Sequence, residues 1–403
     1  MTRRSFLAWS SALGLASLAG GRARAGGPKN LLVLWSAGGW DPTFVFDPHF
    51  EDDSISNDLE SEPATARGVS FAAAESRPSV SRFFERYGDR AAVINGLAVG
   101  SISHEGCTRL LLTGGRAQGR ADVGTAVASA SGSSLILPHL VLSGPRYPGS
   151  LGALVVPLNA TLAGVSSGAL PAAAEVDEQA EARARAWLLD EADRLGASDR
   201  PALGAYRDGL TDLPELQQVL AELDPPADPT DEDRISLAIR ALSADAARAV
   251  TLALSPPNQT TWDSHYDNRE NQDRAFEQLF GQLITVMEGL EGVAADGGSL
   301  LDRTLVLVLS EMGRAPALNA ADGKDHWPYT SALLVGAGVA GGQVIGGTDA
   351  RMVGRRIDLA TGALDEGGQR PGPANLLASV VEAFDGDPTA LWGEATPLGA
   401  WRA

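Results

Sequence analysis

The sequence has a single cysteine and no long apolar segment. Because Cys107 is alone among 403 residues, an intramolecular disulfide is impossible. The apolar stretch 8–19 is too short for a membrane span, which needs about 20 apolar residues, and no other segment comes close. We therefore expect no transmembrane segment in the mature chain and a fold without covalent cross-links.

Positive charge is also scarce. The chain has 32 Lys and Arg against 51 Asp and Glu, a formal net charge of −19 at pH 7. Such a charge is repelled by nucleic acid and by anionic lipid, so binding to DNA, RNA or a membrane surface is excluded. An anionic substrate would need a locally positive site. The apolar fraction of 44% is that of an ordinary globular protein large enough to bury a core.

The first 25 residues follow the three-part plan of a secretory signal peptide. Paired arginines at 3–4 precede Phe6 and Leu7, an apolar stretch follows, and Ala23-Arg24-Ala25 is an A-x-A cleavage pattern. The paired arginines resemble the twin-arginine class, which carries folded proteins. We expect residues 1–25 to be a twin-arginine signal peptide, the twin-arginine export machinery to be a partner, and residues 26–403 to be periplasmic or extracellular. A disordered basic tail before a short helix is the alternative.

Alternating strand and helix patterns predict an α/β fold with a doubly wound, mainly parallel sheet between helices. Residues 271–291 have apolar side chains at helical steps of three and four, and 172–195, 214–223 and 231–247 also have helical patterns. A helical insertion is expected at about 166–247, and residues 50–130 are expected to be the most irregular part, with loops over the site. Compact apolar runs predict buried strands at 30–36, 91–95, 139–143, 153–157, 249–254, 304–310 and 331–335.

Polar side chains follow several of these strands, where the site of an open α/β sheet is expected. Three of the five histidines, His104, His265 and His326, stand there beside carboxylates. Imidazole and carboxylate ligands together suit Zn²⁺, Mn²⁺ or Fe, with Mg²⁺ or Ca²⁺ where oxygen dominates. The candidate metal ligands are Asp41, Asp263, His265, Glu311, Asp325 and His326.

Each of these residues also has a structural interpretation. Asp41 could cap the turn after the first strand. Asp263 and His265 could make ordinary loop hydrogen bonds. Glu311 follows an apolar strand and needs a partner, for which Arg314 is available. His326 could anchor a turn through the Trp and Pro that follow it. Their joint placement at strand ends favours one common site.

Several motifs resemble a known bacterial family. They are Gly-Gly-Trp-Asp41, Phe-Asp-Pro48, Trp-Asp-Ser-His265, Ser-Glu-Met-Gly-Arg-Ala-Pro316, Gly-Lys-Asp-His-Trp-Pro328 and the glycine-rich segment 341–349. These resemble the family called domain of unknown function 1501, which is similar to the alkaline phosphatase and sulfatase superfamily. The resemblance spans about residues 30–395 and is most specific at 260–350. It implies an alkaline-phosphatase-like fold and a two-metal site that hydrolyses phosphate or sulfate esters.

The resemblance assigns metal-binding roles. Asp41 matches a first-strand metal aspartate, and Asp263 with His265 matches an aspartate–histidine metal pair. Glu311 keeps a carboxylate at a strand end, whereas Met312 stands where a metal histidine belongs and is a poor ligand for hard divalent ions. Asp325 or His326 matches the last ligand.

The nucleophile position departs from the superfamily pattern. Aligning on Leu112-Thr-Gly114 places His104 there. Cys107 is three residues out of register and lacks the following proline, so a formylglycine precursor is not expected. His104 is the candidate nucleophile or acid–base group, or else another metal ligand. Arg314 or Lys324 is expected to hold an anionic substrate group or to neutralise nearby carboxylates.

The sequence therefore predicts an exported hydrolase of a small anionic phosphate or sulfate ester that depends on a divalent metal (Zn, Mn, Fe or Ca). The alternative is a non-catalytic envelope protein of the same fold that binds a partner or a carbohydrate. Met312 and His104 favour this alternative because both break the catalytic pattern. A dinucleotide site at the glycine-rich segment 336–341 is disfavoured because no helix start follows it.

Overall fold

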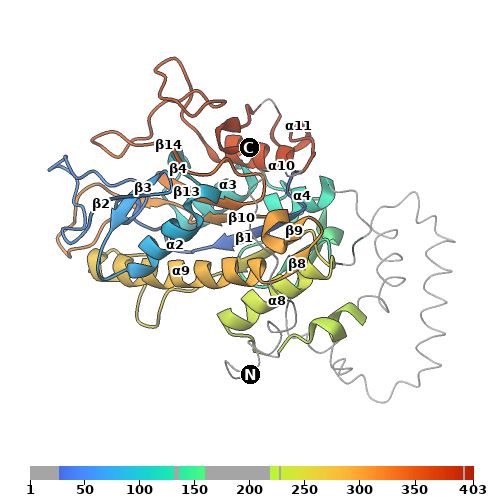
Figure 1. Cartoon of the computed structure of the whole chain (residues 1–403). Helices are drawn as coiled ribbons and strands as arrows, with labels where there is room; N and C mark the ends of the chain where they lie inside the picture. The colour runs from blue at the N-terminus through green and yellow to red at the C-terminus, as the bar shows by residue number, and fades with distance from the viewer. Residues whose placement is uncertain (1–26, 131–134, 136, 159–217, 227, 394) are drawn as a thin grey trace, which may run out of the picture.

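The computed structural model describes residues 27–130, 135, 137–158, 218–226, 228–393 and 395–403. Its centre is an eight-stranded sheet with helices on both faces (Figure 1). The strand order is β14-β4-β13-β10-β1-β7-β5-β6. All seven predicted strands are present in this sheet. They are β1 (Asn30–Trp35), β4 (Ala91–Ala98), β5 (His139–Val141), β6 (Val155–Pro157), β7 (Ala249–Ala253), β10 (Thr304–Leu309) and β13 (Tyr329–Gly336).

The sheet is mainly parallel, as predicted. β1 pairs in parallel with β7 and with β10, β5 pairs in parallel with β6 and with β7, and the edge strand β14 (Gln343–Gly346) pairs in parallel with β4. Only β13 runs the other way, antiparallel to both β10 and β4. The carboxyl ends of β1, β4, β7 and β10 therefore lie at the same edge, where β13 begins.

The strands are apolar throughout because both faces of the sheet are covered. Along β10, Val306 and Val308 face one core, and Leu305, Leu307 and Leu309 face the other. One face packs against α2 (Pro78–Tyr87), α8 (Asp231–Ser243) and α9 (Asn268–Glu291). The other packs against α3 (His104–Thr113), α4 (Val123–Ala130) and α10 (Pro373–Ala383). Figure 1 shows α8 and α9 on one side and α10 on the other.

Short elements complete the described chain. A hairpin of β2 (Glu62–Ala66) and β3 (Val69–Ala73) precedes α2. The short strands β11 (Gly313–Arg314) and β12 (His326–Trp327) pair beside the carboxyl edge, and β8 (Ala294–Ala295) pairs with β9 (Gly298–Ser299). The remaining elements are α11 (Thr389–Trp392), η1 (Pro42–Phe44), η2 (Gly88–Arg90), η3 (Gly152–Leu154), η5 (Leu300–Arg303) and η6 (Gly399–Trp401).

One sequence-based expectation is wrong. Residues 50–130 are not mainly irregular, because they contain the β2–β3 hairpin, α2, β4, α3 and α4. The α2 helix begins with Pro78 at its first turn, where the missing N–H costs nothing, and it buries Phe83 and Phe84 against α9. The predicted signal peptide at 1–25, the predicted helix at 172–195 and most of the predicted insertion at 166–247 lie outside the described residues. No helix in the described part is long and apolar enough to cross a membrane.

Burial of Leu307 in the central strand leads to the first prediction. Its side chain is fully buried between β1 and β13, so Leu307→Ala should lower the free energy of unfolding by about 2–5 kcal/mol through lost burial and a cavity. Urea unfolding followed by circular dichroism measures the change. Leu364, which is 51% exposed, is the matched control, and its alanine variant should change the free energy by less than about 0.5 kcal/mol. Equal losses in both variants would contradict the assigned core.

Candidate metal centre

The carboxyl edge of the sheet brings together residues that are far apart in the sequence. His104 is the first residue of α3, after β4, and the Ser103 hydroxyl caps this helix by accepting the Gly106 N–H. Asp263 and His265 follow β7, and Glu311 follows β10. His326 lies on β12, where it pairs in register with Arg314 of β11 just before the reversed strand β13.

Three imidazole nitrogens converge on one carboxylate. His326 Nε2 and His265 Nε2 lie 3.1 and 3.2 Å from Asp263 Oδ1, and His104 Nε2 lies 3.3 Å from Asp263 Oδ2. The Nε2 atoms of His265 and His326 are 3.0 Å apart. We refer to the candidate ligands His104, His265, His326 and Asp263 together as the metal cluster.

Each histidine of the metal cluster is held from behind by an oxygen acceptor. His104 Nδ1 lies 2.8 Å from Glu311 Oε1, His265 Nδ1 lies 3.2 Å from Asp325 Oδ1, and His326 Nδ1 lies 2.7 Å from the carbonyl oxygen of Ile102. Since a carbonyl or an ionised carboxylate can only accept, each Nδ1 carries a proton. In the neutral ring the Nε2 lone pair is then free, and this arrangement is typical of histidines that bind metal.

The cluster's donor set fits a divalent cation. Three Nε2 lone pairs and a carboxylate that face one another repel unless a proton or a cation lies between them. Among the described residues, one group of His, Cys, Asp and Glu side chains meets the spacing of a metal site, namely His104, Asp263 and His326. Three nitrogens and one oxygen suit Zn²⁺, Mn²⁺ or Fe better than Ca²⁺ or Mg²⁺, which prefer oxygen.

Arg314 fixes the position of Asp263. Its guanidinium is fully buried, and Nη2 donates to Asp263 Oδ1 at 2.7 Å. Partial burial would by itself raise the pKa of the Asp263 carboxyl, but the hydrogen bond and charge of Arg314, together with His326 and His104 when these rings are protonated, lower the pKa to about 2. Asp263 is therefore ionised at any ordinary pH and ready to bind a cation.

Glu311 lies behind His104 rather than in the centre of the cluster. Its side chain is buried, and Oε1 accepts both the Gly38 N–H at 2.7 Å and the hydrogen bond of His104. This hydrogen bond and the charges of Glu311 and Asp263 raise the pKa of His104, against the opposing effect of partial burial. Glu311 Oε2 is buried and has no hydrogen-bond partner among the described residues.

Asp41 and Lys324 form a separate, fully buried ion pair. Lys324 Nζ lies 2.7 Å from Asp41 Oδ2, and the other carboxylate oxygen accepts the backbone N–H and the hydroxyl of Thr43. Asn268 Nδ2 also donates to Asp41 Oδ2, at 3.0 Å. The Asp41 carboxylate is thus neutralised by an internal ammonium, and it caps η1 as the structural interpretation anticipated.

Close backbone packing at a glycine turn shapes the floor of the site. Gly38 and Gly39 have φ of +126° and +89°, and a Cβ on Gly38 would lie 2.7 Å from Cβ of Trp262. A Cβ on Gly39 would lie 2.7 Å from Cγ of Met312. A larger side chain at Gly38 would therefore displace the segment that carries Asp263, and one at Gly39 would displace Met312.

Met312 and Cys107 do not belong to the metal cluster. Both are fully buried and pack together with Val99 in a small apolar cluster. Burial raises the pKa of the Cys107 thiol. A buried, protonated thiol agrees with the expectation that Cys107 is not a modified nucleophile.

The structure divides the nine candidate residues into three groups. Asp263, His265 and His326 meet His104 in the metal cluster. Glu311, Asp325 and Arg314 orient His104, His265 and Asp263 from behind, and Asp41 and Lys324 pair with each other. Sequence reasoning missed the Ile102 carbonyl that orients His326 and the Gly38 N–H that binds Glu311, because backbone groups leave no signal in residue type.

Comparison with known proteins identifies a family. A family model described as Protein of unknown function (DUF1501) matches residues 28–358, so the resemblance read from the motifs is confirmed. No curated protein matches the chain. Among solved structures, it is similar to a protein in the alkaline phosphatase superfamily from Vibrio parahaemolyticus, with 10% identity and a TM-score of 0.40 over 92% of this chain and 71% of that chain. It is also similar to the PsFucS1 sulfatase from Pseudoalteromonas sp., with 11% identity and a TM-score of 0.34 over 93% and 74%.

The Glu311–His104 hydrogen bond leads to the second prediction. In metal-free protein, Glu311→Gln should lower the pKa of His104 because the charge-assisted hydrogen bond and the nearby negative charge are lost. A titration of the imidazole signals by nuclear magnetic resonance measures it. Asp325→Asn is the matched control, since Asp325 contacts His265 and not His104. A pKa of His104 that is the same in wild type and Glu311→Gln would show that Glu311 does not orient this ring.

Proposed function

The chain belongs to the DUF1501 family, described as proteins of unknown function, and we propose that it is a metal-dependent hydrolase of phosphate or sulfate esters. The observation that carries the proposal is the convergence of three Nε2 atoms on Asp263 while each Nδ1 is held by an oxygen acceptor. In this proposal Asp263, His265 and His326 hold one divalent ion, of the Zn, Mn or Fe type, and His104 lies beside it without binding it.

A divalent ion at the cluster would act as a Lewis acid toward an ester oxygen and offset the charge that develops in the transition state. The protein residues have distinct roles. Arg314 keeps Asp263 ionised and in place, and Glu311 and Asp325 orient the rings of His104 and His265. His104 is the candidate proton carrier, because its hydrogen bond to buried Glu311 favours the protonated ring.

Access from solvent supports a reactive site. The side chains of His104, His265 and Asp263 are 42%, 41% and 37% exposed, so a substrate could reach the cluster from outside. The buried Lys324 is paired with Asp41 and is not available to a substrate. The anionic ester group would therefore be bound mainly by the ion and by His104, which in this proposal is protonated and is not a ligand.

Export by the twin-arginine route remains part of the proposal. It is supported by the order of paired arginines, apolar stretch and A-x-A pattern in residues 1–25. The route would deliver a folded chain to the periplasm or beyond, with its metal already bound.

A second candidate is a non-catalytic protein that holds a structural metal. One observation favours it: if His104 Nε2 also bound the ion, Asp263 and the three histidines would supply four protein ligands, and closed four-ligand shells are typical of structural sites. Catalytic sites usually leave one position for water or substrate. The two candidates agree on metal binding and differ in turnover.

Metal content gives the third prediction. Protein purified without chelators should contain a near-stoichiometric amount of Zn, Mn or Fe, measured by plasma mass spectrometry. The His265→Ala/His326→Ala variant should lose it, because two of the candidate ligands are gone. His49→Ala is the matched control: His49 bonds Thr348, outside the cluster, and its loss should leave the metal content unchanged. Folded wild-type protein that takes up none of these ions would refute both candidates.

Turnover separates the two candidates and is the fourth prediction. Metal-loaded wild type should hydrolyse 4-nitrophenyl phosphate or 4-nitrophenyl sulfate, followed by the absorbance of released nitrophenolate. His104→Ala should lower kcat by about 10²-fold or more, since a positioned acid–base group contributes 10²–10⁴. His49→Ala should retain wild-type kcat. A metal-loaded wild type that cleaves neither ester would leave the structural-metal candidate.

A further inference from the structure

The segment that carries Asp263 and His265 is folded into consecutive tight turns. The Ser264 N–H donates to the Trp262 carbonyl at 3.0 Å. The His265 N–H donates to the Asp263 carbonyl at 3.1 Å. Hydrogen bonds between residues two apart fold a segment on itself but do not fix it against the rest of the protein. Contacts from outside must therefore set where these two candidate ligands lie, and Arg314 supplies one of them, to Asp263.

Ser264, between the two candidate ligands, anchors the segment from a fully buried position. Its hydroxyl donates to Asn268 Oδ1 at 2.6 Å and accepts a hydrogen bond from Gln272 Nε2 at 2.9 Å. Its carbonyl oxygen accepts the Lys324 N–H, also at 2.9 Å. One small residue is thus tied both to α9 and to the segment that leads into His326.

Asn268 and Gln272 lie one helical turn apart on α9, and both are buried. Asn268 Nδ2 donates to Asp41 Oδ2 at 3.0 Å, and Gln272 Oε1 accepts the Asp41 N–H at 2.7 Å. Gln272 Nε2 also donates to the Trp262 carbonyl at 2.9 Å. Each amide both donates and accepts, so the direction in which it faces is fixed. The two amides therefore hold the segment around Ser264 against the turn after β1.

We infer that Ser264, Asn268 and Gln272 are positioning residues of the metal cluster. They fix where Asp263 and His265 lie and thereby raise the affinity of the cluster for a divalent ion, although none of the three is a candidate ligand. Ligands that are already held in place lose less conformational freedom when the ion binds. The effect on affinity rests on the metal site of the proposed function, and it does not depend on turnover.

Ser264→Ala tests the inference because it removes the hydroxyl without adding bulk. Calorimetric titration of the metal-free full chain with Zn²⁺ should give a Kd about 10- to 100-fold higher in this variant than in wild type, the range typical of lost groups that orient ligands. The visible absorption spectrum of the Co²⁺-loaded protein should also change, because the ligand geometry around the ion is altered.

Ser379→Ala is the matched control. Ser379, on α10, is also fully buried, and its hydroxyl donates to the Leu376 carbonyl at 2.7 Å and accepts from Trp401 Nε1 at 2.8 Å. Both alanine variants should lower the melting temperature of the metal-free protein by similar amounts. Only Ser264→Ala should change the Zn²⁺ affinity and the Co²⁺ spectrum, which a merely structural serine would leave unaltered.

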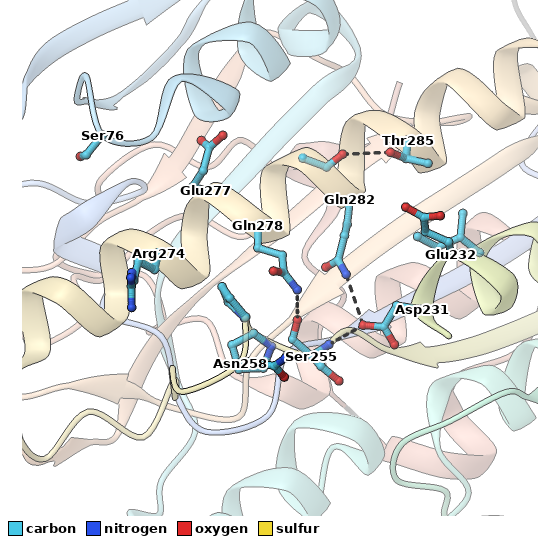
Figure 2. Close-up of a pocket in the computed structure, with 14 residues that line it drawn as sticks. Ser76, Asp231, Glu232, Ser255, Asn258, Arg274, Glu277, Gln278, Gln282 and Thr285 are labelled. Carbon is cyan, nitrogen blue, oxygen red and sulfur yellow. Dashed lines mark hydrogen bonds between the residues drawn. The ribbon is translucent and has the colours of Figure 1, made fainter. Parts of the chain in front are cut away.

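A second pair of variants tests the α9 amides. Gln272→Met keeps the length of the side chain and removes its polar groups without adding charge, and it should raise the Zn²⁺ Kd by a similar factor. Gln278→Met is its control. Gln278, on the same helix, lines a hollow and donates to the Ser255 carbonyl at 2.8 Å (Figure 2), and its loss should leave the Kd unchanged.

One measurement needs no metal. The rings of His265 and His326, with centroids 4.6 Å apart, should give a nuclear Overhauser effect in metal-free wild type that is lost in Ser264→Ala and kept in Ser379→Ala. Wild type that shows this effect but binds no Zn²⁺ would refute the metal site, and its loss in Ser264→Ala would still demonstrate positioning.

Two outcomes would overturn the inference while leaving the proposed metal site intact. One is a Ser264→Ala variant with the Zn²⁺ Kd, the Co²⁺ spectrum and the ring contact of wild type. The other is an equal loss of affinity in Ser264→Ala and Ser379→Ala, because general stability rather than the position of the ligands would then set the affinity.

Discussion

The buried guanidinium of Arg314 is the interaction on which the rest of the site depends. It donates to the carbonyl oxygens of Gly38, Gly39, Trp262 and Lys324 and to the carboxylate of Asp263. These acceptors come from the turns after β1 and β7 and from the segment before β12. A planar, permanently charged group with five donors can satisfy so many acceptors at once, which a lysine could not. Arg314 thereby joins three chain segments and fixes the cluster's only carboxylate.

The direction of strand β13 explains how His326, in the segment that precedes this strand, reaches the metal cluster. In a purely parallel sheet the residues before a strand lie at the opposite edge from the residues after its neighbours. Since β13 is antiparallel to β10 and β4, the residues that precede it lie where those two strands end. His326 therefore enters the site from the start of a strand, whereas His104, Asp263 and Glu311 enter from strand ends. The β11–β12 pairing sets its exact register against Arg314.

The sheet could be predicted from the sequence because its strands are continuous apolar runs, and the residues of the site could be found because they follow those runs. Which oxygen binds which ring could not be predicted. Glu311 and Asp325 look like ligands by residue type, yet they hold His104 and His265 from behind. The pairing of Asp41 with Lys324 depends on packing between residues 283 positions apart, which local pattern does not encode. Apart from the predicted strand at 91–95, the elements within residues 50–130 mix small polar with apolar side chains, so their periodicity is weak in the sequence.

If the cluster binds an ion as proposed, its spacing along the chain would link metal uptake to completion of the fold. Its members are residues 104, 263, 265 and 326, so a fragment that ends before 326 has an incomplete set, and the set comes together only after β4, β7, β10 and β13 are in one sheet. An ion that binds only the native arrangement stabilises the native state by mass action. It does not stabilise partly folded chains, in which the ligands have not yet come together. The ion would then bind late in folding, after the sheet has formed. Only fully folded, full-length chains would retain it, whereas truncated or misfolded chains would not.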